Sequence, residues 1–447
     1  MYSRRKFIQN SSAVLAGAGI AGAALPVEAI AQSRKKGAAA SDKVIVGLIG
    51  CKGMGMSNLR SILKLPQVEC KALCDVDQNI LEERAQDLVK MGYKKPVLYK
   101  DYRKMLEDKE IDAVIIATPD HWHCLPFIHA CEAGKDIYCE KPMANYVEEC
   151  NLMVKATKKY DRVVQLGQWQ RSNGHFKKAV EFVQSGKLGR IRMVKVWAYQ
   201  GWMNSVPPVA DAPVPKGVDY DMWLGPAPER PFNQNRFHFT FRWFWDYAGG
   251  LMTDWGVHLL DVALWGMNAT APISVMSAGG KYAYPDDPTE TPDTQQAVYE
   301  FKDFMMVWDH AIGIDSCNFN RNHGIAFIGN NGTLIVDRGG WEVVPEVRGP
   351  GLERAYLMDA VPKHGSADSG LDKHMENFVE CIKTRALPNC HVDTGSLAAI
   401  NAHLGNIALK TGRKLYWDAA KGNFGNDAEA NKMLVPDYRS PWKLPVV

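Results

Sequence analysis

The sequence feature that most constrains the fold is an alternation of short apolar stretches with helical patterns over residues 43–167. The apolar stretches predict buried strands, and the segments between them have helical spacing. Such alternation requires right-handed crossovers, so it predicts an α/β domain with a parallel, doubly wound sheet. The loops that follow the strands then gather along one edge, where ligands of this fold class bind. The predicted strands are residues 44–50, 69–74, 112–118, 137–139 and 163–167.

A glycine-rich turn follows the first of these strands. Gly50 and Gly55 hold the first and third positions of the pattern G-x-G-x-x-G, whereas Lys52 holds the second, followed by Gly53 and Met54. A pyrophosphate at a helix N-terminus needs backbone amides at close range, and side chains in the turn would block them. We therefore expect Gly50, Gly53, Met54 and Gly55 to hold the phosphates of a dinucleotide.

Asp75 comes directly after the second predicted strand, about twenty residues beyond the glycine turn, where a carboxylate can accept both ribose hydroxyls of an adenosine. A 2′-phosphate beside this carboxylate would bring two anions together, so Asp75 favours NAD over NADP as the cofactor. The alternative is that Asp75 caps the following helix, although Asp77 is better placed for that role.

The fourth predicted strand ends at Glu140-Lys141-Pro142. Glu140 and Lys141 then lie at the carboxyl end of a buried strand, at the edge expected to bind ligands. Pro142 predicts the start of a helix, because its fixed backbone angle suits the first helical position. The alternative is a surface ion pair between two neighbours in a loop.

From Gln168 onward strand patterns predominate, and we expect a second domain around an open, mostly antiparallel sheet. The polar, Pro-rich segment of residues 201–242 has no period and is expected to wrap around the substrate cleft or a partner subunit. Two C-terminal helices are expected to pack back on the sheet. The predicted elements are helices at 176–184, 374–383 and 396–410, and strands at 191–199, 273–277, 295–301, 304–310, 324–328, 333–336 and 415–417.

Asp254 and His258 are four residues apart in a helical pattern, so they share one helix face. A carboxylate one turn from an imidazole can orient the ring and adjust its basicity, as a proton-abstracting histidine requires. The alternative is a helix-capping Asp254 and a core histidine.

The N-terminal segment indicates export rather than folded structure. Arg4 and Arg5 precede the small-residue run 13–25, and Ala29-Ile30-Ala31 fits a cleavage site. The run is too short to span a bilayer, so no stable membrane insertion is expected. A disordered tail is the alternative. The predicted division is a twin-arginine signal peptide (1–31), a linker (32–42), a dinucleotide-binding domain (43–167), a second domain (168–417) and a C-terminal extension (418–447), in an exported, periplasmic protein.

The composition excludes several classes of partner. A hydrophobic content of 46%, a charged content of 23% and a net charge of +3 are ordinary for a soluble enzyme and give no basic field for nucleic acid. The ten cysteines are dispersed, without metal-knuckle or redox spacing, and we interpret them as mostly free and buried. His121-Trp122-His123 lacks the further ligands that a zinc site needs, so no metal is expected.

Four motifs together resemble the Gfo/Idh/MocA family (glucose-fructose oxidoreductase and inositol dehydrogenase) over residues 43–417. The resemblance implies a Rossmann domain, an open C-terminal α/β sheet, and a nicotinamide cofactor that meets a sugar or cyclitol between them. It assigns Lys141 as the active-site lysine and Asp254 with His258 as an acid–histidine pair, while Lys52 departs from the usual glycine. The motifs are Gly50 to Gly55 with Asp75, Ala117-Thr118-Pro119 with His121, Glu140-Lys141-Pro142, and Gly249-Gly250 through Asp254 to His258.

The expected reaction is oxidation of a secondary alcohol, in which His258 removes the hydroxyl proton and the Lys141 cation lowers the barrier. Two alternatives are open: redox-assisted cleavage of a glycoside through a transient keto-sugar, and a non-catalytic sugar-binding protein. A homo-oligomer formed through the C-terminal sheet is expected. Further cofactor contacts are expected at Thr118, Pro119, His121, Glu140, Lys141 and Gln168, and further substrate contacts at Trp169, Arg171, Tyr247 and Trp255.

Overall fold

The computed structural model describes residues 43–316, 318–349 and 355–447. The predicted signal peptide at 1–31, with its paired arginines, and the predicted linker at 32–42 lie outside the described residues. Within the described ranges, none of the helices combines the length and apolar character that crossing a membrane requires.

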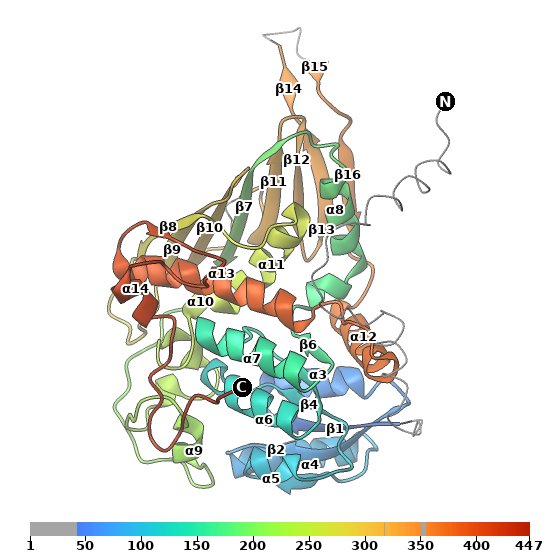
Figure 1. The fold of residues 1–447 in the computed structure, drawn as a ribbon, viewed down its shortest axis with the longest axis vertical. Coiled ribbons are helices and arrows are strands. Elements are labelled where there is room, and N and C mark those ends of the chain that lie inside the picture. The colour runs from blue at the N-terminus through green and yellow to red at the C-terminus, as the bar shows by residue number, and fades with distance from the viewer. Residues whose placement is uncertain (1–42, 317, 350–354) are drawn as a thin grey trace, which may run out of the picture. The chain divides into compact units, whose positions relative to one another are not determined.

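The first sheet contains six parallel strands in the order β3-β2-β1-β4-β5-β6 (Figure 1). The predicted doubly wound sheet is therefore confirmed. Only the short edge strand β3 was missing from the sequence prediction, because three partly exposed residues carry no clear apolar period. The strands are β1 (Val44–Ile49), β2 (Val68–Cys74), β3 (Val97–Tyr99), β4 (Ala113–Ile116), β5 (Asp136–Cys139) and β6 (Val164–Leu166).

Helices cover both faces of this sheet. One apolar core joins it to α5, α6 and α7, and a second core joins it to α3, α4 and the C-terminal helix α12. The predicted capping role of Asp77 is confirmed, because its side chain accepts the N–H of Asn79 at the start of α4. The helices are α3 (Gly53–Ile62), α4 (Gln78–Lys90), α5 (Tyr102–Leu106), α6 (Cys124–Glu132), α7 (Val147–Lys159) and α12 (Gly370–Thr384), with short 3-10 turns at Asp120–Trp122 and Trp169–Ser172.

The prediction that Pro142 starts a helix is wrong. The Lys141–Pro142 peptide bond is cis, and α7 begins only at Val147. The carboxylate of Glu149 determines this start, because it accepts the N–H groups of Asn145 and Tyr146 at 3.0 and 2.9 Å. An acid inside the first turn of a helix satisfies amides that the helix itself cannot.

The second sheet contains nine strands in the order β16-β13-β12-β11-β7-β10-β9-β8-β17. All neighbours are antiparallel except β7 and β10, so the predicted mostly antiparallel sheet is confirmed. The strands are β7 (Ile191–Gln200), β8 (Ser274–Gly280), β9 (Thr294–Glu300), β10 (Met305–Ile312), β11 (His323–Gly329), β12 (Gly332–Asp337), β13 (Gly340–Pro345), β16 (Val361–Gly365) and β17 (Leu415–Tyr416), and a separate pair is formed by β14 (Val347–Arg348) and β15 (Ala355–Tyr356).

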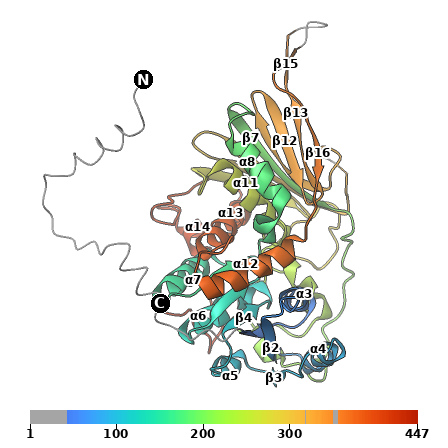
Figure 2. The ribbon, with the colours of Figure 1, turned by 90° about the vertical axis from the view of Figure 1, so that its right-hand side faces the viewer.

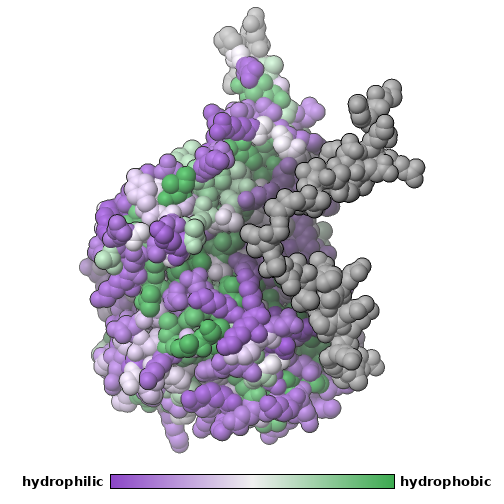
Figure 3. All heavy atoms as spheres, viewed as in Figure 1, coloured by the Kyte–Doolittle hydropathy of each residue, from purple (hydrophilic) through white to green (hydrophobic). Residues whose placement is uncertain are grey.

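Helices cover one face of the second sheet (Figures 1 and 2). They share an apolar core with the inward side chains of the strands. On this helix-covered side the surface carries mostly hydrophilic residues, with smaller apolar areas between them (Figure 3). The helices of this part are α8 (Gly174–Gln184), α10 (Gly250–Asp254), α11 (Gly256–Met267), α13 (Val392–Thr411) and α14 (Ala428–Lys432).

The polar segment of residues 201–242 packs against the ligand-binding edge of the first sheet. It contains α9 (Tyr220–Leu224) and two 3-10 turns at Gln234–Arg236 and Thr240–Trp243, and it encloses an aromatic cluster of its own. His238 Nε2 lies 3.0 Å from Asp77 Oδ2, and the N–H of Gln78 donates to the carbonyl of Gly217. These contacts attach the segment to the loop after β2.

Candidate functional site

The glycine turn leads directly into α3 and leaves its first amides available. Lys52 is the N-cap residue, but its side chain caps no amide. A Cβ on Gly50 would lie 2.6 Å from the backbone of Ala117, and one on Gly55 would lie 2.0 Å from the carbonyl oxygen of Gly50. Gly53 has φ +45°, and a Cβ there would meet open space. The turn therefore fits the close approach of a phosphate to a helix N-terminus.

A cavity of about 410 Å³ extends from this turn along the carboxyl ends of the strands. Its walls come from the first sheet on one side and from residues 222–242 on the other. Eight of the predicted cofactor residues line it: Gly50, Gly53, Met54, Asp75, Thr118, Pro119, Glu140 and Lys141.

Asp75 links the end of β2 to the glycine turn. Its Oδ2 accepts the N–H of Cys51 at 2.7 Å, and its Oδ1 accepts the N–H of Asp77 at 3.0 Å. Burial raises the pKa of Asp75, with the nearby Asp77 acting in the same direction and the bonds from these amides opposing the shift. A carboxylate offers about four acceptor positions, so two remain for the hydroxyls of a ribose.

Three predicted cofactor residues, Gly55, His121 and Gln168, are not among those that line the cavity, and two of them have buried polar side chains. The His121 ring is buried, and its Nε2 lies 3.1 Å from the carbonyl oxygen of Trp223. Burial lowers the pKa of His121 to about 4. Gln168 is completely buried, and the thiol of Cys390 donates to its Oε1 at 3.4 Å. Both side chains therefore support the walls of the cavity from behind.

Several lining residues were not found from the sequence because they belong to the segment without a period. His238, Phe239 and Arg242 all face the cavity, and the Phe239 ring is half exposed. The guanidinium of Arg242 stacks on Phe239 at 4.8 Å and on Phe241 at 4.7 Å. The aromatic residues in the segment were the available signal, but no spacing indicated which of them would reach the cavity.

Lys141 and Asp254 form an ion pair that joins the domain of the first sheet to the domain of the second sheet. Lys141 Nζ lies 2.7 Å from Asp254 Oδ1 and 2.9 Å from the Asp254 carbonyl oxygen, and Arg242 Nε donates to the same carboxylate at 3.2 Å. Both paired side chains are only 14% exposed. Burial favours the neutral acid, but the Lys141 and Arg242 cations outweigh it and hold the pKa of Asp254 well below its usual range.

His258 lies on α11 beside this pair, but the structure gives no hydrogen bond between it and Asp254. Trp255 separates α10 from α11, and Asp254 is turned toward Lys141 instead. Burial lowers the pKa of His258 well below its usual value, and the charges of Lys141 and Arg338 add to the effect. The imidazole is therefore neutral, and its Nδ1 has no hydrogen-bond partner among the described residues.

The predicted substrate residues divide into two groups. Trp169 and Trp255 lie near the cluster of Lys141, Asp254 and His258, with the Trp169 ring 6.3 Å from that of His258. Arg171, in contrast, forms a two-pronged ion pair with the buried Asp261 at 2.8–3.0 Å. Tyr247 is completely buried, with its ring 5.2 Å from that of His121. Arg171 and Tyr247 are therefore packed as structural supports.

Two acids complete the cluster. Asp120 lines the cavity, and burial raises its pKa to about 7 against the opposing charges of Arg242 and Lys141. Glu140 accepts the side-chain N–H of Asn58 at 2.8 Å, and a Cβ on Gly167 would collide with it. The sequence prediction included Glu140 but not Asp120.

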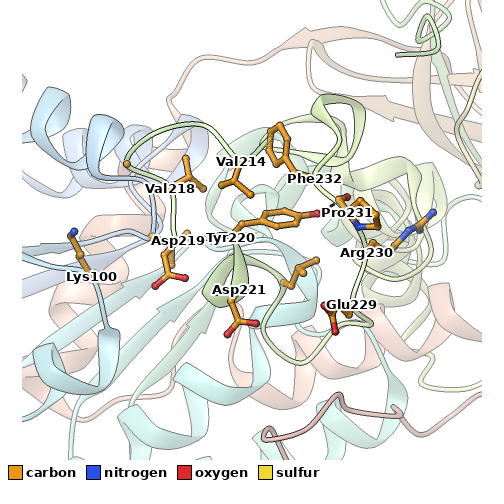
Figure 4. A pocket seen from close by; sticks show the side chains of 13 residues that line it. Lys100, Val214, Val218, Asp219, Tyr220, Asp221, Glu229, Arg230, Pro231 and Phe232 are labelled. Carbon is orange, nitrogen blue, oxygen red and sulfur yellow. Dashed lines mark hydrogen bonds between the residues drawn. The ribbon is translucent and has the colours of Figure 1, made fainter. Parts of the chain in front are cut away.

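A second, shallower hollow of about 1090 Å³ lies next to the cavity and shares Val76 and Lys100 with it (Figure 4). Three of its charged side chains have partners within the protein. Asp219 accepts the N–H of Met222 at the start of α9, Asp221 pairs with Arg439 at 2.7 Å, and Arg230 pairs with Asp246 at 2.8 Å. These residues hold the shape of the 201–242 segment.

The described residues contain no group of three or more His, Cys, Asp or Glu side chains that could hold a metal. The nine cysteines in the same ranges are free, and all except Cys70 are buried. The glycine turn, the cavity and the buried Lys–Asp pair together define a dinucleotide-binding protein with a polar cluster beside its cofactor cavity.

Comparison with known families supports this class. Residues 44–168 match the description "Oxidoreductase family, NAD-binding Rossmann fold", and residues 173–343 and 355–444 match "Oxidoreductase family, C-terminal alpha/beta domain". The chain belongs to the Gfo/Idh/MocA oxidoreductase family, as the resemblance of its motifs indicated.

Relatives in sequence match about a third of the chain. An uncharacterized oxidoreductase YrbE from Bacillus subtilis is 30% identical over 154 residues, which are 34% of this chain and 44% of that protein. A glycosyl hydrolase family 109 protein from Shewanella baltica is 37% identical over 160 residues, 33% of this chain and 35% of the relative. This chain thus matches less than half the length of these relatives.

Solved structures resemble the whole fold. The WlbA dehydrogenase from Bordetella pertussis, in complex with NADH and UDP-GlcNAcA, has a TM-score of 0.61 at 18% identity, covering 84% of this chain and 99% of that one. A levoglucosan dehydrogenase in complex with NADH has a TM-score of 0.63 at 19% identity, covering 83% and 98%. At this identity the likeness concerns the fold alone.

Proposed function

We propose that the protein transfers hydride between a secondary alcohol of a sugar or cyclitol and a bound nicotinamide cofactor, with NAD preferred over NADP. The observation that carries the proposal is the ion pair of Lys141 and Asp254, which places a fixed cation at the end of the dinucleotide cavity beside the neutral imidazole of His258. The sugar dehydrogenases among the similar structures support the substrate class.

The residues divide the chemistry between them. The neutral His258 takes the proton of the reacting hydroxyl, because an imidazole with a free nitrogen can accept it. The Lys141 ammonium stabilises the negative charge that develops on the alcohol oxygen, and Asp254 fixes the position of that ammonium. A nicotinamide cofactor bound in the cavity supplies the hydride acceptor.

We further propose that the cofactor is retained rather than exchanged. The cavity is closed on one side by residues 222–242, with Phe239 and His238 facing the glycine turn and Asp75. Retention for hours at an association rate of ~10⁶ M⁻¹s⁻¹ requires a dissociation constant of about 0.1 nM. A retained cofactor must be regenerated in place, which favours a closed cycle within one substrate or between two.

Retention matters if the protein is exported, as we propose from Arg4-Arg5 and the segment that follows. Little free dinucleotide is available outside the cytoplasm, whereas twin-arginine export carries a folded protein with its cofactor. Replacing both arginines with lysine should leave unprocessed protein in the cytoplasm. Unchanged processing and location would contradict export by this route.

A second candidate function is redox-neutral cleavage of a glycoside, in which the cofactor oxidises the sugar transiently and then reduces it again. The similarity to glycosyl hydrolase family 109 proteins and to a protein named alpha-N-acetylgalactosaminidase from Shewanella oneidensis, 35% identical over 160 residues, favours it. The same three residues would perform the oxidation step.

We also propose a homo-oligomer formed through the second sheet. The face of this sheet opposite the helices carries the exposed side chains of Met276, Met305 and Val344. The strand register places Met193 and Ile328 in the row of side chains that runs across the sheet from Met305 to Val344. Apolar side chains on an uncovered sheet favour burial against a second copy. Light scattering of wild type and Met305→Lys tests this assignment, and a wild-type monomer would contradict it.

The function itself is tested by incubating the purified protein with sugars, cyclitols and glycosides while the absorbance of the bound cofactor and the products are followed. Oxidised sugar with reduced cofactor supports the dehydrogenase, and a free aglycone without net cofactor reduction supports cleavage. A protein that holds the cofactor but converts none of these compounds would contradict both and support a binding protein.

A further inference from the structure

Arg338 is a largely buried cation for which the described part of the chain provides no anionic partner. It lies in the turn between β12 and β13, and its guanidinium carbon is 4.7 Å from the ring centre of Trp169 and 4.5 Å from that of Trp255. Its Nε is buried without a hydrogen-bond partner. Among the described residues, none forms an ion pair with Arg338 or accepts a hydrogen bond from its side chain.

Other buried arginines of this protein are paired. Arg171 binds Asp261, and Arg321 binds both Asp337 and Glu342. Asp337 precedes Arg338 in the chain, but its carboxylate is used by Arg321 and by the N–H of Gly339. Because a buried unpaired cation is costly, its retention here calls for a partner that the described residues do not supply.

The nearest catalytic acid cannot serve as that partner. Among the described residues, Asp254 is the acid whose charge acts on Arg338, and its carboxylate is already bonded to Lys141 and Arg242. Lys141, Arg242 and Arg338 thus act on the carboxylate of Asp254, while burial raises the pKa values of the neighbouring acids Asp120 and Glu140. The Asp254 carboxylate therefore supplies no separate partner for Arg338.

Arg338 lies within reach of the reacting group. The Trp169 ring is 4.7 Å from the guanidinium carbon and 6.3 Å from the His258 ring, so the guanidinium lies within about 11 Å of that imidazole. One sugar residue with its substituents can span such a separation. A substrate whose hydroxyl meets His258 can therefore present a second group to Arg338.

We propose, on the basis of the proposed function, that the substrate is a sugar acid whose carboxylate is bound by Arg338. The guanidinium carbon lies over the rings of both Trp169 and Trp255, so we expect a ligand to meet the edge of the guanidinium. The planar fork of the guanidinium matches the two oxygens of a carboxylate in a two-pronged hydrogen bond.

The test compares matched substrates on the cofactor-loaded protein: hexuronic acids, their methyl esters, and the corresponding neutral hexoses. The wild-type protein should prefer the acid over the ester and the neutral sugar by about 10- to 100-fold in kcat/KM, the range for a charge-assisted pair. Calorimetric titration with the uronate should show the same order in affinity.

Arg338→Gln should reduce this preference by about 10- to 100-fold, and Arg338→Lys should restore part of it, since it keeps the charge but loses the fork. Lys302→Gln is the matched control, because it removes a cation from the exposed turn between β9 and β10, at the other end of the sheet. It should behave as wild type.

Equal use of acid and ester by the wild type would overturn the proposal, even if Arg338→Gln fails to fold. A preference for sulfated or phosphorylated sugars would overturn the assignment to a carboxylate. Reduction of the cofactor by neutral sugars only would refute the sugar acid and leave the proposed function intact. Tight uronate binding in calorimetry without any cofactor reduction would support the Arg338 site and contradict the proposed function.

Discussion

Lys141 Nζ lies 2.7 Å from Asp254 Oδ1. This contact joins the loop after strand β5 of the first domain to helix α10 of the second domain. The two residues are over a hundred positions apart in the chain, at the meeting point of the cofactor cavity and the second domain. Both are largely buried, so the pair is held in place rather than fluctuating in solvent.

Removing Asp254 should affect both stability and turnover. Asp254→Asn leaves Lys141 and Arg242 buried beside a neutral amide, and we expect the free energy of unfolding to fall by about 3 kcal/mol. The double variant Lys141→Met/Asp254→Asn should recover part of this loss, because the unpaired cation is gone. Urea denaturation of the single and double variants measures the coupling. Losses that simply add would show that the pair is not coupled.

Lys141→Met and His258→Asn should each remove most turnover while the cofactor stays bound. A general base contributes 10²–10⁴-fold, and a loss of this size is expected in kcat. Stopped assays and the absorbance of bound cofactor give both quantities. Lys302→Gln serves as the control for loss of a lysine charge. Rates near those of wild type in either variant would mean that the residue has a structural role only.

Asp75→Ala should weaken NAD binding by roughly 1–3 kcal/mol and narrow the difference between NAD and NADP, because charge-assisted hydrogen bonds are lost. Asp101→Ala is a matched control, since Asp101 caps α5 and does not line the cavity. Calorimetry on cofactor-free protein measures both affinities. Tighter binding of NADP than NAD by the wild type would refute the preference.

Stability should fall as the pH drops from about 6.5 toward 4. Burial lowers the pKa of His310 to about 4, so in this window the unfolded chain binds a proton that the folded protein does not. His310→Gln should therefore reduce the loss of unfolding free energy between pH 7 and pH 5 by about 1–2 kcal/mol. His364→Gln, at an exposed position, is the control. Identical pH profiles for wild type and His310→Gln would contradict the assignment. Other buried histidines whose pKa is lowered to about 4 are His121, His123, His374 and His403.

Much of the fold could be predicted because local pattern and tertiary packing agree. The periods of apolar residues located β1, β2 and α8, which were predicted at 44–50, 69–74 and 176–184 and are observed at Val44–Ile49, Val68–Cys74 and Gly174–Gln184. The glycine turn could be recognised because Gly50 and Gly55 meet backbone atoms where a Cβ would collide. The spacing of these glycines is a local pattern, so it can be recognised from the sequence alone.

The rest of the site depends on contacts between distant residues. Arg338 precedes two glycines, and in the sequence it looks like part of an ordinary hairpin turn. In the structure the ring of Trp169, which is distant in the chain and lies where the first domain ends, packs against its guanidinium. The same holds for Asp254, whose spacing to His258 predicted a carboxylate–imidazole contact. The carboxylate instead bonds to Lys141, because a full positive charge attracts it more strongly than a neutral ring.

We propose that the sugar carbon that carries the reacting hydroxyl gives its hydrogen, as hydride, to a cofactor held by this protein. This transfer is tested most directly with the best substrate from the panel, labelled with deuterium at the reacting carbon, on protein purified without added NAD. Mass spectrometry of the released nicotinamide should show deuterium in the bound cofactor after a single turnover. A substrate that is converted while the nicotinamide gains no deuterium, or protein that purifies without any cofactor, would contradict the account.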